Sequence, residues 1–433
     1  MKRWIYLLAL LLPLGCSQDK PNIYFTPEKA KWYFSEIEAA CNRDNGKLWG
    51  KNLYGPVMFI DRPARKIISN IPDNEGILKL KDGIYTGSYP KEMIIDNSSK
   101  LFGGTLYATA ALTQNEDTLR NMGMAIQGLY LSHLINSGKE IPRYNTRQID
   151  DKNARLWLKL EWHALRKAIT STGELQKQSL RDALIFRGAR RELFPREIMD
   201  ENTFESVMGL SLLTYDLFIT RSEEEAKQKL LKSLSDFYGF QSYSRTYGYI
   251  HGALYGFLAY EKGFDFKTAL PDTIDLALLV KGLYDIQLPG ICRDVAGSLA
   301  LGYDLEYIYK EEETRLTEIR DRLHRRIAVF TEKPVVFFEL ESPYFDFEPE
   351  EVRSLDTLGT IYNSIRVLDN WGKLTVEKGG CLVSSNLKSI RVTAKNLTEA
   401  KNHISGEGWH LILNSDWQMV KVEENYFVRQ LRP

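Results

Sequence analysis

The stretch Glu116 to Ile135, EDTLRNMGMAIQGLYLSHLI, is the centre around which we expect the rest of the chain to fold. Its apolar side chains recur at the spacing of one helix face, at Leu119, Met122, Ala125, Ile126, Leu129 and Ile135. This spacing predicts an inward-facing helix. A β-like run, GTLYATAAL at residues 104–112, precedes it, and a long helical block follows it.

The chain before this helix is predicted to form one helix and one sheet. Thr26-Pro27-Glu28 is a strong helix start, with Thr26 as the cap and Pro27 at the first helical position. Short β-like runs follow between residues 55 and 112, separated by Gly, Pro, Asn and Asp. We expect them to form an antiparallel sheet that packs on the first helix.

The chain after the central helix changes from helical to β-rich patterns. Ser222 and Glu225 form a capping box at the start of one of the predicted helices. Short alternating or apolar runs between turn residues then continue to the end, which predicts a sandwich or barrel. The change comes at Pro334, after a charged helical segment. The predicted fold class is therefore α+β, with a mainly helical body at residues 26–332 and an all-β domain at residues 333–433.

The N-terminus is predicted to be a processing signal. Residues 1–15 contain two basic residues and then an apolar run that is too short to span a bilayer. Cys16 directly follows a glycine, as in a lipoprotein signal, although Pro13 stands where leucine is usual. We expect Cys16 to carry a lipid, residues 16–25 to be a polar tether, and Ser17 to favour the outer membrane of a bacterial envelope. The alternative is a plain secretory signal, which would leave Cys16 an ordinary thiol.

Composition excludes some classes of partner. Lys plus Arg and Asp plus Glu are equal, at 57 each, so no basic excess indicates nucleic acid. Aromatic residues make up 12% of the chain, which fits recognition of a peptide or glycan but also fits tyrosines in cores. The remaining cysteines, Cys41, Cys292 and Cys381, lack metal-binding spacing and are predicted to be buried hydrophobic residues without a disulfide framework.

Four stretches resemble a family of secreted or lipid-anchored bacterial proteins that are similar to zinc metallopeptidases. They are LWLKLEWHALRKAI (156–169), ALIFRGARRELFP (183–195), ENTFESVMGLSLLTY (201–215) and LGTIYNSIRVLDNWGKLTV (358–376). In that family the central helix carries H-E-x-x-H and a later helix carries an E-G-L-A-E-Y-type run. The resemblance implies a zincin-like body for residues 26–332.

The resemblance also implies that the metal site has been lost. The two histidines and the catalytic glutamate of the family would fall at Ile126, Tyr130 and Gln127, and the third ligand at Met208. Ile126 offers no lone pair, and Gln127 cannot act as a base. Tyr130 is a poor zinc ligand near neutral pH, and the thioether of Met208 is unsuited to Zn²⁺. We therefore expect no metal and no cofactor.

Two glutamates of the later helix are candidate cleft residues. Glu201 and Glu205 share a helix face and match acidic positions in the resembled family. The alternative interpretation is structural, because carboxylates in such helices commonly hold arginines, here Arg187 or Arg190.

Glu161 and His251 complete the candidate cleft. Glu161 lies near His163 within EWHAL, but residues two apart on a helix face different ways, which favours an interior histidine. His251 lies in YGYIHGALYGFLAYEKG, where glycines recur every four residues and allow close helix packing as the alternative to a binding role.

Three functions fit these patterns. The leading hypothesis is an envelope lipoprotein, attached to the membrane by its N-terminal lipid, that binds a peptide, protein or glycan without catalysis. The second is an active zinc peptidase with displaced ligands among Glu201, Glu205 and His251. The third is an accessory scaffold that docks a partner through its β domain.

Overall fold

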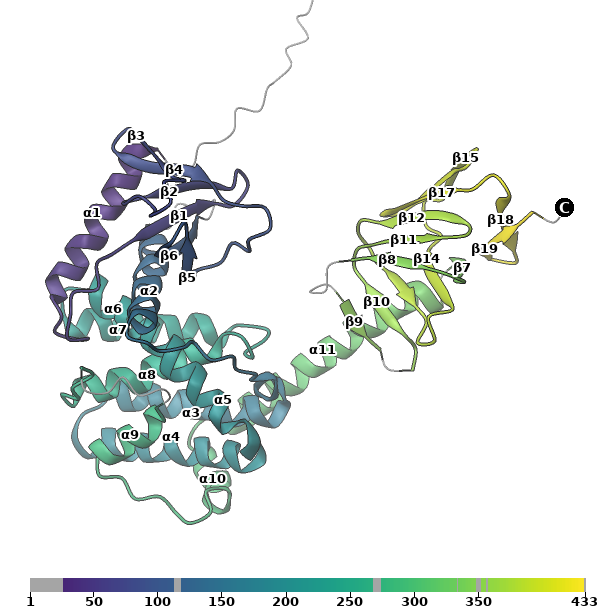
Figure 1. Cartoon of the computed structure of the whole chain (residues 1–433). Helices are drawn as coiled ribbons and strands as arrows, with labels where there is room; N and C mark the ends of the chain where they lie inside the picture. The colour runs from purple at the N-terminus through teal and green to yellow at the C-terminus, as the bar shows by residue number, and fades with distance from the viewer. Residues whose placement is uncertain are drawn as a thin grey trace, which may run out of the picture. The chain divides into compact units, whose positions relative to one another are not determined.

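The computed structural model describes residues 26–112, 118–267, 274–332, 334–347, 352–355 and 357–431. The predicted signal peptide, the tether and Cys16 lie outside these residues. The chain divides into two compact units, Met1–Glu312 and Glu313–Pro433, which are drawn in Figure 1. The predicted α+β class is confirmed, since a sheet, a helical middle and a β-rich end follow one another.

The first unit begins with a helix and a six-stranded sheet. The strands are β1 (Val57–Asp61), β2 (Lys66–Ser69), β3 (Lys79–Lys81), β4 (Ile84–Ser88), β5 (Ser98–Phe102) and β6 (Thr105–Leu112). Their order is β3-β4-β2-β1-β6-β5. The prediction of an antiparallel sheet is wrong at one pair, because β1 and β6 run parallel. The chain passes through β2 to β5 before β6 returns beside β1, and this long connection permits a parallel pair.

The first helix, α1 (Pro27–Asp44), starts and ends as its sequence indicates. The Thr26 hydroxyl accepts a hydrogen bond from the Lys29 N–H at 3.2 Å, and Asn45 ends the helix in the left-handed conformation. The predicted helix start is confirmed. Its buried face packs in the same core as the inward side chains of the sheet.

The predicted central helix is α2 (Thr118–Asn136). Met122, Ala125, Ile126 and Leu129 are buried, as expected for an inward face. Leu119 departs from the prediction, because it lies in the first turn and is 54% exposed. The helix approaches the sheet so closely that a Cβ on Gly128 would come within 2.7 Å of the Ser98 carbonyl oxygen.

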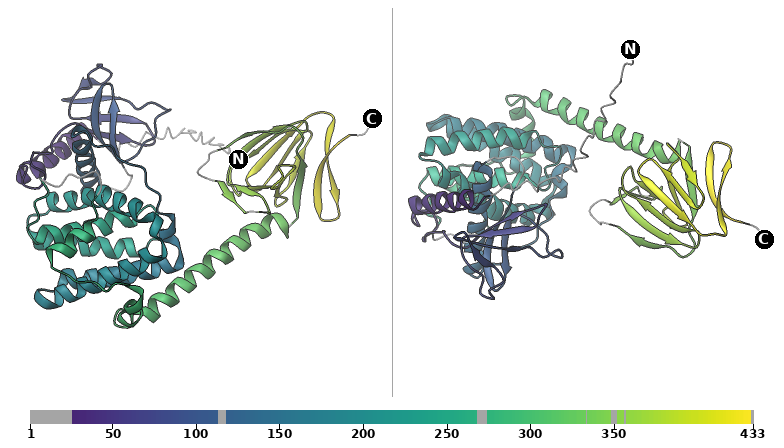
Figure 2. Two further views of the ribbon diagram at one scale, coloured as in Figure 1. Left: turned by 60° about the horizontal axis from the view of Figure 1, so that its bottom comes forward. Right: turned by 90° about the horizontal axis from the view of Figure 1, so that it is seen from above.

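A helical scaffold follows, stacked in layers beside the sheet (Figures 1 and 2). Its helices are α3 (Lys152–Thr170), α4 (Gly173–Leu193), α5 (Ile198–Phe204), α6 (Leu210–Ile219), α7 (Glu223–Tyr238), α8 (Tyr247–Glu261), α9 (Leu276–Leu283) and α10 (Arg293–Ala300), and α11 (Leu305–Thr331) leads on into the second unit. Short 3-10 turns, η1 (Arg147–Asp150) and η2 (Pro195–Glu197), and a π-helical segment, Glu205–Gly209, connect some of them. The predicted cap is present, since Ser222 accepts a hydrogen bond from the Glu225 N–H at 3.2 Å.

The second unit is a two-sheet sandwich. Its strands are β7 (Val335–Glu339), β8 (Tyr344–Asp346), β9 (Val352–Ser354), β10 (Thr360–Tyr362), β11 (Ile365–Asp369), β12 (Gly372–Val376), β13 (Cys381–Val383), β14 (Ser389–Thr393), β15 (Thr398–Ala400), β16 (His403–Gly406), β17 (Trp409–Leu413), β18 (Trp417–Val422) and β19 (Asn425–Gln430). They form sheets of order β18-β19-β7-β14-β13-β10-β9 and β15-β16-β17-β12-β11-β8. Side chains of both sheets share one core around Phe338, Val367, Leu374 and Leu411.

The end of α11 belongs to the second unit. Phe330 packs with Ile361 and Leu382 of the sandwich strands in a small apolar cluster. The compact units therefore divide within α11, at Glu312 and Glu313, whereas the sequence pattern changes at the end of that helix.

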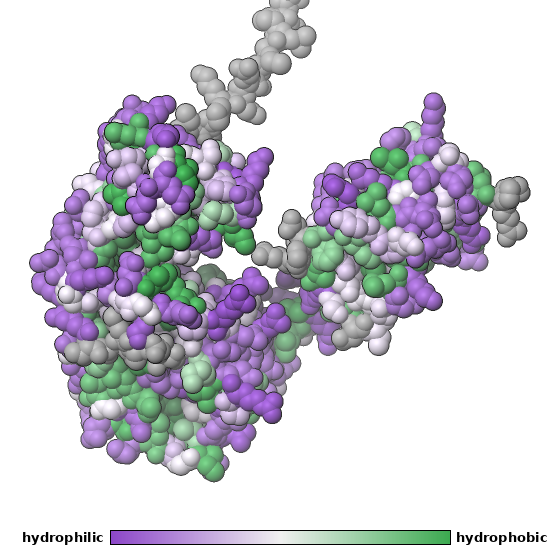
Figure 3. Space-filling view, viewed as in Figure 1, coloured by the Kyte–Doolittle hydropathy of each residue, from purple (hydrophilic) through white to green (hydrophobic). Residues whose placement is uncertain are grey.

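The surface carries mainly polar side chains, and the thiols of the described cysteines lie in the interior. Figure 3 shows one face, on which polar side chains predominate and apolar ones form separate patches. Cys41, Cys292 and Cys381 are buried free thiols, in agreement with their predicted role. Among the described residues, no helix combines the length and the apolar character needed to cross a membrane.

Candidate functional site

The positions of the expected zinc motif lie on α2 and face the interior. Ile126 is in the main core, and Gln127 is half-buried. The Tyr130 ring packs against Trp49 with centroids 4.9 Å apart. Burial raises the pKa of the Tyr130 hydroxyl well above its usual range. At neutral pH these groups offer neither a thiolate, an imidazole nor a carboxylate.

Met208, the position of the expected third ligand, lies in the π-helical segment and is partly buried against the core. The following helix, α6, packs against α2, since the Tyr215 hydroxyl donates to the Leu119 carbonyl at 2.9 Å. A Cβ on Gly123 would come within 2.5 Å of the Tyr215 ring. Within the described ranges, no three His, Cys, Asp or Glu side chains are placed so that they could hold a metal ion.

The four candidate cleft residues come together from four segments. Glu161 comes from α3, Glu201 from α5, Glu205 from the π-helical segment and His251 from α8. Each of them is 0% exposed. They therefore form part of a buried cluster of charges rather than the lining of an open cleft.

Glu161 lies at the centre of this cluster. Its carboxylate accepts a hydrogen bond from the Tyr255 hydroxyl at 2.6 Å, and Nε2 of His251 lies 2.8 Å from the same oxygen. Guanidinium nitrogens of Arg187 and Arg190 lie 3.6 Å and 3.4 Å away. Burial alone would raise the pKa of Glu161, but the charges of His251 and the two arginines outweigh it and hold the pKa far below its usual range. Glu161 is thus ionised in the protein interior.

Glu205 forms a bidentate ion pair with Arg187. Nη1 of Arg187 lies 3.0 Å from one carboxylate oxygen, and Nη2 contacts the other. The same Nη1 lies 2.9 Å from Nε2 of His251. Burial would lower the pKa of Arg187, but Glu205, Asp275 and Glu161 raise it well above its usual value. The guanidinium therefore stays charged.

Glu201 and Asp275 close the cluster on its other side. Glu201 pairs with Arg190 and lies 3.1 Å from Nε of Arg191. Asp275 lies 2.6 Å from Nη1 of Arg191 and caps α9. Burial would raise the pKa of Asp275, but Arg187 and Arg191 lower it to about 2. The prediction that Glu201 and Glu205 hold arginines agrees with these contacts.

The carboxylates of this cluster outnumber its guanidinium groups. Four carboxylates, Glu161, Glu201, Glu205 and Asp275, face the guanidinium groups of Arg187, Arg190 and Arg191. Nε2 of His251 lies 2.8 Å from the Glu161 carboxylate, which can only accept, and 2.9 Å from Nη1 of Arg187, which can only donate, so the tautomer decides which of the two hydrogen bonds it forms. Nδ1 is buried and, among the described residues, has no hydrogen-bond partner.

Glycines allow α8 to reach this cluster. A Cβ on Gly252 would lie 2.1 Å from the Glu205 carbonyl oxygen, and one on Gly248 would lie 2.4 Å from the Phe204 ring. The glycine repeat around His251 therefore serves close helix packing, as the alternative interpretation proposed. His163 lies elsewhere, half-buried, with Nδ1 3.5 Å from Asp304.

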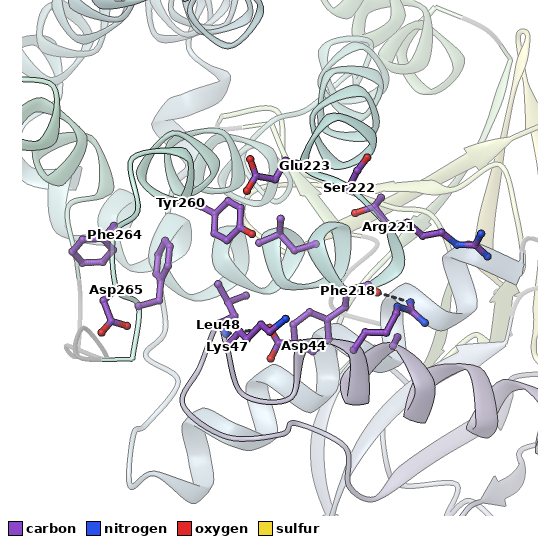
Figure 4. Close-up of a pocket in the computed structure, with 15 residues that line it drawn as sticks. Asp44, Lys47, Leu48, Phe218, Arg221, Ser222, Glu223, Tyr260, Phe264 and Asp265 are labelled. Atoms are coloured by element: carbon purple, nitrogen blue, oxygen red, sulfur yellow. Dashed lines mark hydrogen bonds between the residues drawn. The ribbon is translucent and has the colours of Figure 1, made fainter.

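A surface pocket of about 410 Å³ lies where the end of α1, the α6–α7 junction and the segment after α8 meet (Figure 4). Phe218, Tyr260, Phe264 and Phe266 line it together with charged side chains of both signs, among them Arg43, Asp44, Arg221 and Glu223. The Arg43 guanidinium donates to the Phe218 carbonyl at 2.9 Å, which ties α1 to α6. Sequence patterns missed this pocket because its residues come from three distant segments.

No family model, no curated protein and no solved structure matches this chain. The resemblance to the zinc metallopeptidases therefore stays a prediction based on the sequence motifs.

Proposed function

We propose that this protein is a lipid-anchored component of the bacterial envelope that binds a peptide, protein or glycan and does not cleave it. The observation that carries the proposal is the burial of Glu161, Glu201, Glu205 and His251, all 0% exposed. Glu201, Glu205 and His251 are the ligands that the active-peptidase hypothesis names, and Glu161 is the remaining candidate cleft residue.

A hydrolytic zinc site needs three protein ligands, an open coordination position and a base beside the bound water. The carboxylates of Glu161, Glu201 and Glu205 instead face arginines at ion-pair distance. Freeing one of them would leave a buried guanidinium without its partner, which is costly. This arrangement favours a structural role for the cluster.

The surface pocket of the first unit supports a binding function. The pocket in Figure 4 combines aromatic side chains with charges of both signs, which suits a ligand that carries both apolar and polar groups. The Cys16 context supports the membrane anchor, and the polar residues after it would hold the folded body away from the bilayer.

Elemental analysis and peptide hydrolysis test the proposal on protein purified without chelator. We expect no stoichiometric zinc and no chelator-sensitive cleavage. Stoichiometric zinc together with such cleavage would overturn the proposal in favour of an active peptidase with ligands among Glu201, Glu205 and His251. Detergent partitioning of Cys16→Ser tests the anchor: the variant should leave the detergent phase, and a variant that stays there like the wild type would refute lipidation.

A further inference from the structure

A second hollow, of about 660 Å³, lies where the loop after α2 meets the segment before α8. It is lined by Tyr144, Asn145, Thr146, Arg147, Ser244 and Arg245. None of these residues belongs to the buried charge cluster or to the pocket in Figure 4. We call it the arginine hollow.

Hydrogen bonds hold the two segments of the arginine hollow together. The Thr146 hydroxyl donates to the Ser244 carbonyl at 2.5 Å. The Asp150 carboxylate accepts from the Ser242 hydroxyl at 2.5 Å and from the Tyr243 N–H at 2.6 Å. The two segments that line the hollow are therefore preorganised, which lowers the entropic cost of binding a ligand.

The arginines of the hollow have no charged partner among the residues that the structure describes. Arg147 and Arg245 are exposed, and neither makes an ion pair or hydrogen bond within the described part of the chain. Arg143, next to Tyr144 along the chain, is likewise exposed and, among those same residues, unpaired. Guanidinium groups pair with planar oxyanions through parallel hydrogen bonds, so the hollow is suited to carboxylates.

An aromatic surface adjoins these charges. The half-buried Tyr144 ring stacks on Phe204, with centroids 4.3 Å apart and planes 14° apart. Phe204 in turn meets Tyr249 edge to face at 5.6 Å. This stacking fixes the orientation of Tyr144, which leaves a rigid apolar surface beside Arg147.

The backbone of the loop also favours a peptide. Residues 140–145 belong to no helix or strand. Tyr144 and Asn145 of this loop line the hollow, and within the described ranges their backbone N–H and C=O groups make no hydrogen bond to the protein. A peptide backbone can pair with such groups, whereas a lone phosphate would use only the arginines.

We propose that the arginine hollow binds a short acidic peptide segment, with its carboxylates on Arg147 and Arg245 and its backbone along Tyr144 and Asn145. The inference rests on the proposed function, because it names the ligand class of a binding protein. It concerns a different surface from the pocket in Figure 4.

Fluorescence anisotropy tests the proposal on the full-length protein in detergent. The probe is a fluorescein-labelled peptide of alternating glutamate and alanine, and its matched control has glutamine in place of glutamate. We expect the glutamate peptide alone to bind, with an affinity that falls as salt rises. Arg147→Ala and Arg245→Ala should each weaken binding by about five-fold, and the pair by more than about ten-fold.

Two further variants keep the test decisive. Arg196→Ala removes an exposed arginine outside the hollow and should bind the peptide like the wild type. Arg147→Glu with Arg245→Glu should lose the glutamate peptide and gain affinity for a lysine–alanine peptide. A circular dichroism spectrum like that of the wild type would show that each variant is folded.

Three results would overturn the proposal. One is equal binding by the wild type and the double alanine variant. Another is equal binding of the glutamate and glutamine peptides. The third is binding of inorganic phosphate that depends on Arg147 and Arg245 without binding of the peptide, which would assign the hollow to a phosphate-bearing ligand such as a glycan. Each leaves the proposed function intact, since that is contradicted by zinc with hydrolysis or by a Cys16→Ser variant that stays in the detergent phase.

Discussion

The first unit uses arginine in two opposite ways. Arg187, Arg190 and Arg191 lie inside it, where each faces a carboxylate. Arg147 and Arg245 line the arginine hollow and, in the part of the chain that the structure describes, have no carboxylate partner. The interior arginines are near charges that they neutralise, while the surface arginines leave their hydrogen-bonding capacity to solvent or a ligand.

The difference has an energetic meaning. An ionised pair in the interior contributes little compared with an apolar core, but removing one partner is destructive because the other charge stays buried. An unpaired surface arginine costs almost nothing to remove. The internal cluster should therefore govern stability, and the arginine hollow should govern binding.

Arg187→Ala is the strongest test of the difference in stability between the buried and the surface arginines. The change leaves Glu205 and Glu161 in the interior without their shared guanidinium, and we expect a loss of about 3–5 kcal/mol in the free energy of unfolding of the first unit. Urea unfolding followed by circular dichroism measures it. Arg147→Ala is the matched control, with an expected change within about 0.5 kcal/mol. Similar losses in the two variants would contradict the division of roles.

A pH titration tests a buried carboxylate whose ion-pair partner is a single lysine, without a hydrogen bond. Asp216 on α6 is buried, and Nζ of Lys229 is 3.7 Å away, too far for a hydrogen bond. Burial raises the pKa of Asp216 to about 7, although Lys229 opposes the shift. The folded protein therefore binds this proton more tightly than the unfolded chain. Stability from Asp216 should be full below about pH 4 and should decline as pH rises to about 7.

Asp216→Asn should remove this component of the pH dependence. Each pKa unit corresponds to about 1.4 kcal/mol, so the variant should be more stable than the wild type by a few kcal/mol at pH 8. Melting temperatures of both proteins between pH 5 and pH 8 would show it. Parallel curves would mean that Asp216 does not titrate in this range.

A double-mutant cycle measures how strongly Arg187 and Glu205 of the buried cluster depend on each other. Arg187→Ala and Glu205→Ala remove the two partners of one ion pair, so the double variant should lose less than the sum of the single losses. We expect a coupling energy of about 1–3 kcal/mol from urea unfolding. Additive losses would indicate that the pair is not a unit.

The smallest expected effect is on the stability of the arginine hollow itself. Arg147→Ala with Arg245→Ala should change the urea midpoint by an amount equivalent to less than about 0.5 kcal/mol. A stabilisation would fit relief of repulsion between like charges. A clear destabilisation would show that these arginines support the fold.

Local features of the fold were predictable from the sequence because neighbouring residues determine them. Thr26 and Ser222 cap helices through contacts three residues away, and the apolar spacing around Ile126 gave the central helix. The glycines around His251 indicated close packing for the same reason, since glycine lacks the side chain that would keep helices apart.

Features that depend on distant segments were not predictable. The parallel pairing of β1 with β6 could not be read from either strand, because a mainly apolar run fits a parallel and an antiparallel neighbour equally well. The burial of Glu161 follows from arginines and a histidine on other helices, and no local pattern distinguishes it from a surface glutamate. The arginine hollow joins residues about 100 positions apart, so sequence analysis did not find it.

Each unit contains a buried cysteine whose chemical labelling can measure how often that unit opens. Cys41 lies in the helical unit and Cys381 in the sandwich core. Burial, as the main cause, raises the pKa of both to about 12, so neither forms the reactive thiolate in the closed state at neutral pH. The rate of labelling at each cysteine would therefore track how often its surroundings open. Peptide mapping of the label would time the two units separately without any introduced probe.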